Sequence, residues 1–223
     1  MNKSQIEDPW RYMVREKISG RKYTVHIRDR KTRFEEAGRQ LELFKMLSSK
    51  KKKNQIKLIV EATNSYLRAI GIDTVAKPKV KIDKLNNNEP IPYSNIKEKY
   101  KLSNEKDIIW MKFAKASGLL CLVCVASSND VNHRIPSHQD QYYLRNPKGT
   151  RPKWKWNTSG IIVHNLGLEY DDSFVLVFPL SNLSNNPSRL TKEDVELGIG
   201  EYLLSQGIPI LDRYSHRKFT TSK

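Results

Sequence analysis

Two short clusters of polar residues follow otherwise apolar segments and have the side chains for chemistry. In the first, Glu61 directly follows an apolar run, and Tyr66 and Arg68 come soon after it. In the second, Asp212 ends an apolar segment and opens a polar run. A carboxylate stabilises the positive charge that develops on a sugar as its glycosidic bond breaks, and it activates water. Tyrosine and arginine donate hydrogen bonds to a departing purine, so both clusters fit cleavage of a nucleoside N-glycosidic bond.

The same residues also fit ordinary structural roles. In that interpretation Glu61 pairs with an arginine, and Tyr66 and Tyr214 are aromatic residues at the edge of the core. Asp212 then caps the chain or bridges to Arg213. Taken one residue at a time, the structural interpretation is the simpler one. The functional interpretation gains when the charge of the whole chain is added to it.

The chain is strongly basic, with 40 Lys and Arg against 24 Asp and Glu, a formal net charge of +16 and a pI near 9.8. Its basic runs are spread along the sequence, at residues 50–53, 77–81 and 148–156. This distribution predicts a basic folded surface and a polyanionic partner such as nucleic acid. The alternative, that these lysines only keep the protein in solution, stays open.

The sequence lacks the usual signature of a metal-dependent nuclease, which needs clustered carboxylates to hold Mg²⁺. No Pro-Asp dipeptide occurs, and the one Asp/Glu-x-Lys triplet, at residues 29–31, has no acidic partner at a convincing spacing. A glycine-rich phosphate loop and a set of zinc ligands are missing as well. We therefore expect no metal and no other cofactor.

The length of 223 residues fits one domain over residues 1–223. No stretch has the roughly 18 apolar residues of a membrane helix, and the first residues do not read as a signal peptide, so we expect a cytoplasmic protein without a membrane partner. Cys121 and Cys124 lie in a predicted strand, where this spacing puts them on opposite faces. They are expected to be reduced core thiols.

The predicted elements alternate between helices and strands without glycine-rich turns between them. We expect four helices: after Asp8, around 37–47, at 104–116 and at 195–205. The lysines at 50–53 are expected to end the second helix, and Asn104 and Asp107 to form a capping box at the start of the third. Strands are expected at 22–28, 56–60, 77–83, 119–126, 154–156, 160–165, 173–180 and 209–216, whereas 61–68 is undecided. The order favours an α+β fold with a large, mostly antiparallel sheet.

These residues resemble those of the PabI-type restriction DNA glycosylases. The resemblance rests on the pair Glu61-x-x-x-x-Tyr66, on Arg28 and Arg30 before it, on the late Asp212, and on chain length. It implies a strongly curved, mostly antiparallel sheet called a half-pipe, flanked by helices, and a homodimer. It also implies excision of adenine from the palindrome 5′-GTAC-3′ in duplex DNA without a metal, leaving abasic sites that become strand breaks.

The resemblance further implies roles for individual residues. Tyr66 and Asp212 are expected beside the flipped adenosine, with Glu61 and Arg30 completing the pocket. His216 is the candidate for a C-terminal histidine, and Lys153, or alternatively Lys155, for a lysine that promotes β-elimination as an AP lyase. The remaining expected DNA contacts are Arg28, Arg33, Arg68 and Arg213.

Three hypotheses follow from the sequence. The first is a sequence-specific DNA adenine glycosylase of a restriction-modification system, which acts by base flipping. The second is a metal-dependent type II restriction endonuclease that hydrolyses phosphodiesters. The third is a basic protein that binds DNA or RNA without catalysing a reaction.

Overall fold

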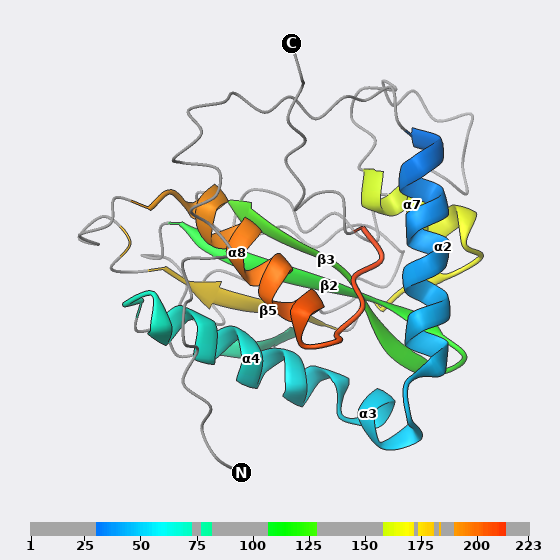
Figure 1. Cartoon of the computed structure of the whole chain (residues 1–223), viewed down its shortest axis with the longest axis horizontal. Coiled ribbons are helices and arrows are strands. Elements are labelled where there is room, and N and C mark those ends of the chain that lie inside the picture. The colour runs from blue at the N-terminus through cyan, green and yellow to red at the C-terminus, as the bar shows by residue number, and fades with distance from the viewer. Residues whose placement is uncertain are drawn as a thin grey trace.

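The structure, a computed structural model, describes residues 30–72, 77–81, 107–128, 158–171, 174–180, 183 and 190–212. Helices and one five-stranded sheet form this part of the chain (Figure 1). The helices are α2 (Arg30–Met46), α3 (Ser49–Lys53), α4 (Gln55–Ala69), α7 (Thr158–Asn165) and α8 (Lys192–Ser205). The strands are β1 (Lys77–Lys81), β2 (Ile108–Ala116), β3 (Leu119–Ser128), β4 (Glu169–Tyr170) and β5 (Phe174–Pro179).

The sheet has the strand order β1-β5-β2-β3, and β4 pairs with β2 beyond the end of β5. All four strand pairings are antiparallel. The one parallel contact among the described residues is an isolated bridge between Leu122 and Ile210. The α+β class and the mostly antiparallel sheet are therefore confirmed.

Helices cover both faces of this sheet. On one face, α4 and α8 pack over a large apolar cluster that includes Ile109, Met111 and Phe113 of β2; Figure 1 shows both helices crossing the sheet. On the other face, α2 and α7 pack over a second cluster that includes Trp110 and Ala114. Alternate residues of β2 thus contribute to two cores.

The β2–β3 hairpin replaces the helix predicted at 104–116. Nearly every residue of β2 is buried, so the polar alternation that identifies a strand is missing from its sequence. The turn after it has positive φ at Ser117 and Gly118, 51° and 76°, as in the two-residue hairpin turns that suit twisted strands. Asp107 is no helix cap: it has φ 56° and precedes β2.

Helix α4 replaces the strand predicted at 56–60 and settles the undecided stretch at 61–68. Its buried residues Ile59, Thr63, Tyr66 and Leu67 recur at helical spacing. A short β-branched run by itself does not distinguish a strand from a buried helix. The strand predicted at 160–165 is wrong for the same reason, because these residues belong to α7.

The helix predicted around 37–47 is confirmed as α2, although the lysines do not close it. Ser48 caps a separate short helix, α3, by accepting a hydrogen bond from the Lys51 backbone nitrogen at 3.3 Å. A serine side chain at this position satisfies an N–H group that has no partner within the helix. The lysine run therefore forms an element of its own between α2 and α4.

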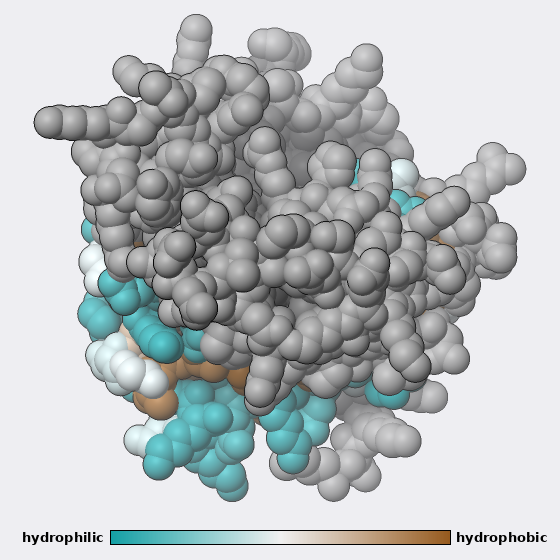
Figure 2. All heavy atoms as spheres, turned by 180° about the vertical axis from the view of Figure 1, so that it is seen from behind, coloured by the Kyte–Doolittle hydropathy of each residue, from teal (hydrophilic) through white to brown (hydrophobic). Residues whose placement is uncertain are grey.

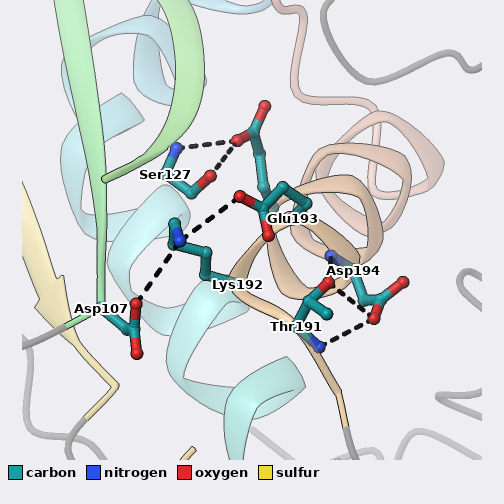
Figure 3. Close-up of polar contacts among 7 residues, drawn as sticks. Asp107, Ser127, Thr191, Lys192, Glu193 and Asp194 are labelled. Carbon is teal, nitrogen blue, oxygen red and sulfur yellow. Dashed lines mark hydrogen bonds and ion pairs between the residues drawn. The ribbon is translucent and has the colours of Figure 1, made fainter. Parts of the chain in front are cut away.

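The predicted strands at 119–126 and 173–180 and the basic strand at 77–83 are confirmed as β3, β5 and β1. The predicted last helix is confirmed as α8, whose capping box joins Thr191 and Asp194. Figure 3 shows this cap beside Lys192, whose Nζ lies 3.6 Å from Asp107 Oδ1 and 3.4 Å from Glu193 Oε1. These contacts hold the start of α8 against the start of β2.

Other predicted elements lie partly or wholly outside the described residues. These are the helix after Asp8, the strands at 22–28 and 154–156, and the end of the strand at 209–216. In the described part of that last segment, Ile210 forms only the isolated bridge to Leu122. No helix in the described part of the chain combines the length and apolar character needed to cross a membrane.

Candidate functional site

Asp212 is held against a β-bulge in β3. Lys112 pairs with Cys124 and the next residue of β2, Phe113, pairs with Leu122, so Val123 is the extra residue. A bulge turns backbone groups away from the regular ladder. The Leu122 carbonyl accepts a hydrogen bond from the Leu211 nitrogen at 3.0 Å, and the Val123 carbonyl accepts one from the Asp212 nitrogen at 2.8 Å.

Helix α2 fixes the same segment from the other side. The Ile210 backbone nitrogen donates to Gln40 Oε1 at 3.3 Å, and Gln40 Nε2 donates to Glu36 Oε1 at 3.1 Å. Glu36 Oε2 in turn lies 2.8 Å from the Arg39 guanidinium. Because Glu36 and Gln40 are buried, this chain of bonds ties α2 to the residues just before Asp212.

The Asp212 side chain is buried and hydrogen-bonded. Only 3% of Asp212 is exposed, and Ser159 Oγ of α7 donates to its Oδ2 at 2.5 Å. A hydroxyl that donates to a carboxylate makes a short, charge-assisted bond, which fixes the orientation of the carboxyl group. Ser159 is itself buried.

Lys112 and Cys124 lie in the same neighbourhood, side by side on β2 and β3. Burial raises the pKa of the Cys124 thiol to about 12; among the smaller influences, Lys112 lowers this pKa, Asp212 raises it, and a hydrogen bond with Ser159 lowers it. Lys112 is 1% exposed, and its Nζ lies 4.8 Å from the centre of the Trp110 ring. The sheet thus buries an amine, a carboxylate, a hydroxyl and a protonated thiol together.

The structure thus holds the Asp212 carboxyl group in one orientation, with only 3% of the residue exposed. A carboxylate held in a fixed orientation stabilises a positive charge that is brought next to it. The Cys124 thiol is a poor nucleophile because its pKa near 12 keeps it protonated at neutral pH.

Both cysteines are free and buried, as the sequence predicts. Their predicted placement on opposite faces is wrong. Cys121 pairs with Ala114 and Cys124 with Lys112, two residues that share a face of β2. The bulge at Val123 adds one residue between the cysteines and brings them to that same face. Burial raises the pKa of Cys121, too, to about 12.

The structure does not bring Tyr66 and Asp212 together. Tyr66 is 0% exposed and belongs to the cluster under α4 and α8, where its ring stacks on Tyr202 with 5.6 Å between ring centres. Asp212 bonds with Ser159 of α7, which packs on the opposite face of the sheet. The two residues therefore occupy opposite sides of the sheet in the described structure.

The other predicted site residues are dispersed. Glu61 is exposed on α4, with its Oε1 3.9 Å from Lys57 Nζ, and Arg68 is exposed near the end of the same helix. Arg30 begins α2 and Arg33 lies in its first turn. Predicted residues outside the described part of the chain are Arg28, Lys153, Lys155, Arg213 and His216.

The sequence by itself did not identify three residues of the site, which are Lys112, Ser159 and Gln40. Lys112 carries a signal, because it is a charged residue with apolar neighbours on both sides in β2. A buried lysine is rare unless it is paired. Ser159 and Gln40 carry no such signal, since their roles depend on the distant position of the chain around Asp212.

The chain matches no family model, and neither a curated protein nor a solved structure is significantly similar to it. Within the described ranges, no three histidine, cysteine, aspartate or glutamate residues are grouped so that they could hold a metal ion.

Proposed function

We propose that this protein is a sequence-specific DNA adenine glycosylase of a restriction-modification system, with Asp212 as its catalytic carboxylate. The observation that carries the proposal is the buried Asp212 side chain, fixed by Ser159, in a chain of net charge +16. A basic chain binds the phosphates of DNA, and an oriented carboxylate suits the cationic sugar formed when a base departs.

In the proposed reaction the bond between C1′ of the sugar and N9 of a flipped adenine breaks. The electron pair leaves with adenine, and Asp212 stabilises the positive charge on the sugar. Water adds its hydroxide to C1′ and its remaining proton goes to adenine, so the products are free adenine and an abasic site. Ser159 acts as a positioning residue because it holds the Asp212 carboxyl group in one orientation.

The proposal includes a half-pipe sheet and a homodimer. Register shifts in the β1–β5 and β2–β3 pairings favour a curved sheet, since bulges bend strands and increase their twist. A two-fold symmetric dimer matches a palindrome such as 5′-GTAC-3′. A restriction enzyme of this type acts in the cytoplasm, and strand breaks follow from the abasic sites, with Lys153 or Lys155 as the proposed source of AP lyase activity.

The proposed function is tested by incubating a duplex that contains 5′-GTAC-3′ with the protein in excess EDTA. Free adenine is then measured by mass spectrometry, and alkali-labile sites are mapped after heating. The proposal expects adenine in proportion to those sites, and a duplex without the palindrome serves as control. Cleavage that needs Mg²⁺ and releases no adenine would instead indicate the restriction endonuclease. Binding without any product would indicate a non-enzymatic nucleic-acid-binding protein.

A further inference from the structure

A cavity of about 410 Å³ lies where α3, α4 and the end of α8 meet. One side of α4 lines the cavity with Gln55, Leu58, Ala62 and Ser65. Tyr202 lines it as well, and its ring stacks on Tyr66 in the core under α4 and α8. The cavity is therefore associated with the face of the sheet opposite to that of Asp212, and its volume suits a small molecule or one nucleotide unit.

Gln55 has an unused hydrogen-bond donor at this cavity. The residue is 1% exposed and lines the cavity, but its Nε2 has no hydrogen-bond partner among the described residues. A buried polar atom without a partner is costly, so such groups usually have one. A ligand that accepts a hydrogen bond from Gln55 would supply the missing partner.

The surroundings of Gln55 favour an anionic ligand. Gln55 begins α4, and the side chain of the preceding residue, Asn54, makes no capping hydrogen bond to this helix. The first N–H groups of a helix attract negative charge. The four lysines of α3 directly precede α4 in the sequence, and Lys51 lines the cavity. None of these lysines has an ion-pair partner in the described part of the chain. Figure 2 shows hydrophilic side chains along the lower edge of the molecule, where α3 and α4 lie in Figure 1.

We propose that this cavity binds one nucleotide unit of a single-stranded nucleic acid. Lys51 and the start of α4 contact its phosphate, whereas the base enters the cavity beside Tyr202 and accepts a hydrogen bond from Gln55. Aromatic rings and basic grooves are the usual means of binding single strands without sequence preference. The site is separate from Asp212 and does not depend on adenine excision.

The lining favours a base over the acyl chain of an anionic lipid. Hydrogen-bonding side chains stand around the cavity, namely Lys51, Gln55, Glu61, Ser65 and Gln206. An acyl chain offers these groups no hydrogen bonds, whereas a base has donors and acceptors along its edge. The test below distinguishes binding to a nucleic acid from binding to a lipid surface.

The test measures binding of the full chain to a fluorescent single-stranded oligothymidylate, which contains no adenine to excise. Gln55→Leu is expected to weaken binding about fivefold to tenfold, the usual effect of one lost hydrogen bond. Its melting temperature should stay equal or rise, because the substitution removes a buried amide nitrogen without a partner. A purely structural Gln55 would lower the melting temperature and leave binding by the folded protein unchanged, which would contradict the proposal.

Three further measurements sharpen the test. An oligonucleotide of abasic sugars should bind the wild type more weakly than oligothymidylate, and Gln55→Leu should reduce this difference.

Lys51→Gln should lower the slope of log K against log salt by about 0.7, whereas the control Lys192→Gln, at the far end of α8, should not. Ala62→Met, which fills the cavity, should weaken binding without unfolding the protein. Binding to phosphatidylglycerol vesicles but not to the oligonucleotide, or unchanged binding in all three variants, would overturn the proposal.

Discussion

The two faces of the sheet bury different kinds of side chain. Under α4 and α8 the core is a large apolar cluster in which Tyr66 stacks on Tyr202. Under α2 and α7 the core also buries Lys112, Ser159 and Asp212. Burial of charged groups costs free energy unless they are paired and hydrogen-bonded. The first face therefore mainly stabilises the fold and borders the proposed nucleotide cavity, whereas the second holds buried charged groups at some cost in stability.

Among single substitutions, truncation of the aromatic stack should have the largest effect on stability. We expect Tyr66→Ala to lower the free energy of unfolding by about 3–5 kcal/mol, because it removes a fully buried aromatic ring and leaves a cavity. Urea denaturation measures the change. A loss below about 1 kcal/mol would show that the first face is not the tightly packed core described above.

The two thiols of the second face should make the protein less stable at alkaline pH. Burial raises the pKa of Cys121 and Cys124 from 9.0 to about 12, so between these values the unfolded chain releases protons that the folded chain retains. The free energy of unfolding should therefore fall as pH rises from 9 to 12, by up to about 1.4 kcal/mol per pH unit for each thiol. Urea denaturation at several pH values measures this slope. Changing both cysteines to alanine should reduce it, and an unchanged slope would contradict the assignment.

Removal of the contact between α2 and the segment before Asp212 should have an intermediate effect. Gln40→Leu leaves the buried Ile210 backbone N–H without its acceptor, which should lower the free energy of unfolding by about 1–3 kcal/mol. The exposed neighbour Arg39 provides the control, and Arg39→Gln should change stability by less than about 1 kcal/mol. Equal effects of the two substitutions would show that Gln40 does not hold the segment.

Substitution of Glu61 should have the smallest effect on stability. Its ion pair with Lys57 spans 3.9 Å between exposed side chains, and such surface pairs contribute little. Glu61→Gln should therefore change the free energy of unfolding by less than about 0.5 kcal/mol in thermal or urea denaturation. A larger loss would mean that the first face depends on a charge that the structure places at its surface.

Local sequence signals predicted the elements whose pattern matches their surroundings. The helix predicted at 195–205 corresponds to α8, and the apolar run at 119–126 predicted the buried strand β3. The prediction was wrong where other elements cover an element on both sides. The sequence of β2 does not alternate between polar and apolar residues, and the apolar segments in α7 and at the start of α4 are too short to distinguish from strands.

The candidate site was predicted only in part, because its geometry depends on contacts between residues far apart in sequence. The sequence identified Asp212 from its position at the end of an apolar segment. Ser159 reaches it from 53 residues away, and Gln40 bonds with Ile210 across 170 residues. The bulge at Val123, which brings Cys124 to the same face as Cys121, is likewise a property of strand pairing that no local pattern reveals.

The most direct test of the difference between the two faces compares Asp212→Asn with Tyr66→Phe in single-turnover release of adenine from duplex 5′-GTAC-3′. Both variants are first checked for folding and duplex binding. The account predicts that Asp212→Asn lowers the rate at least about a hundredfold, the scale of a lost electrostatic contact to the transition state, whereas Tyr66→Phe releases adenine at nearly the wild-type rate. Wild-type release by Asp212→Asn, or loss of release in Tyr66→Phe alone, would contradict it.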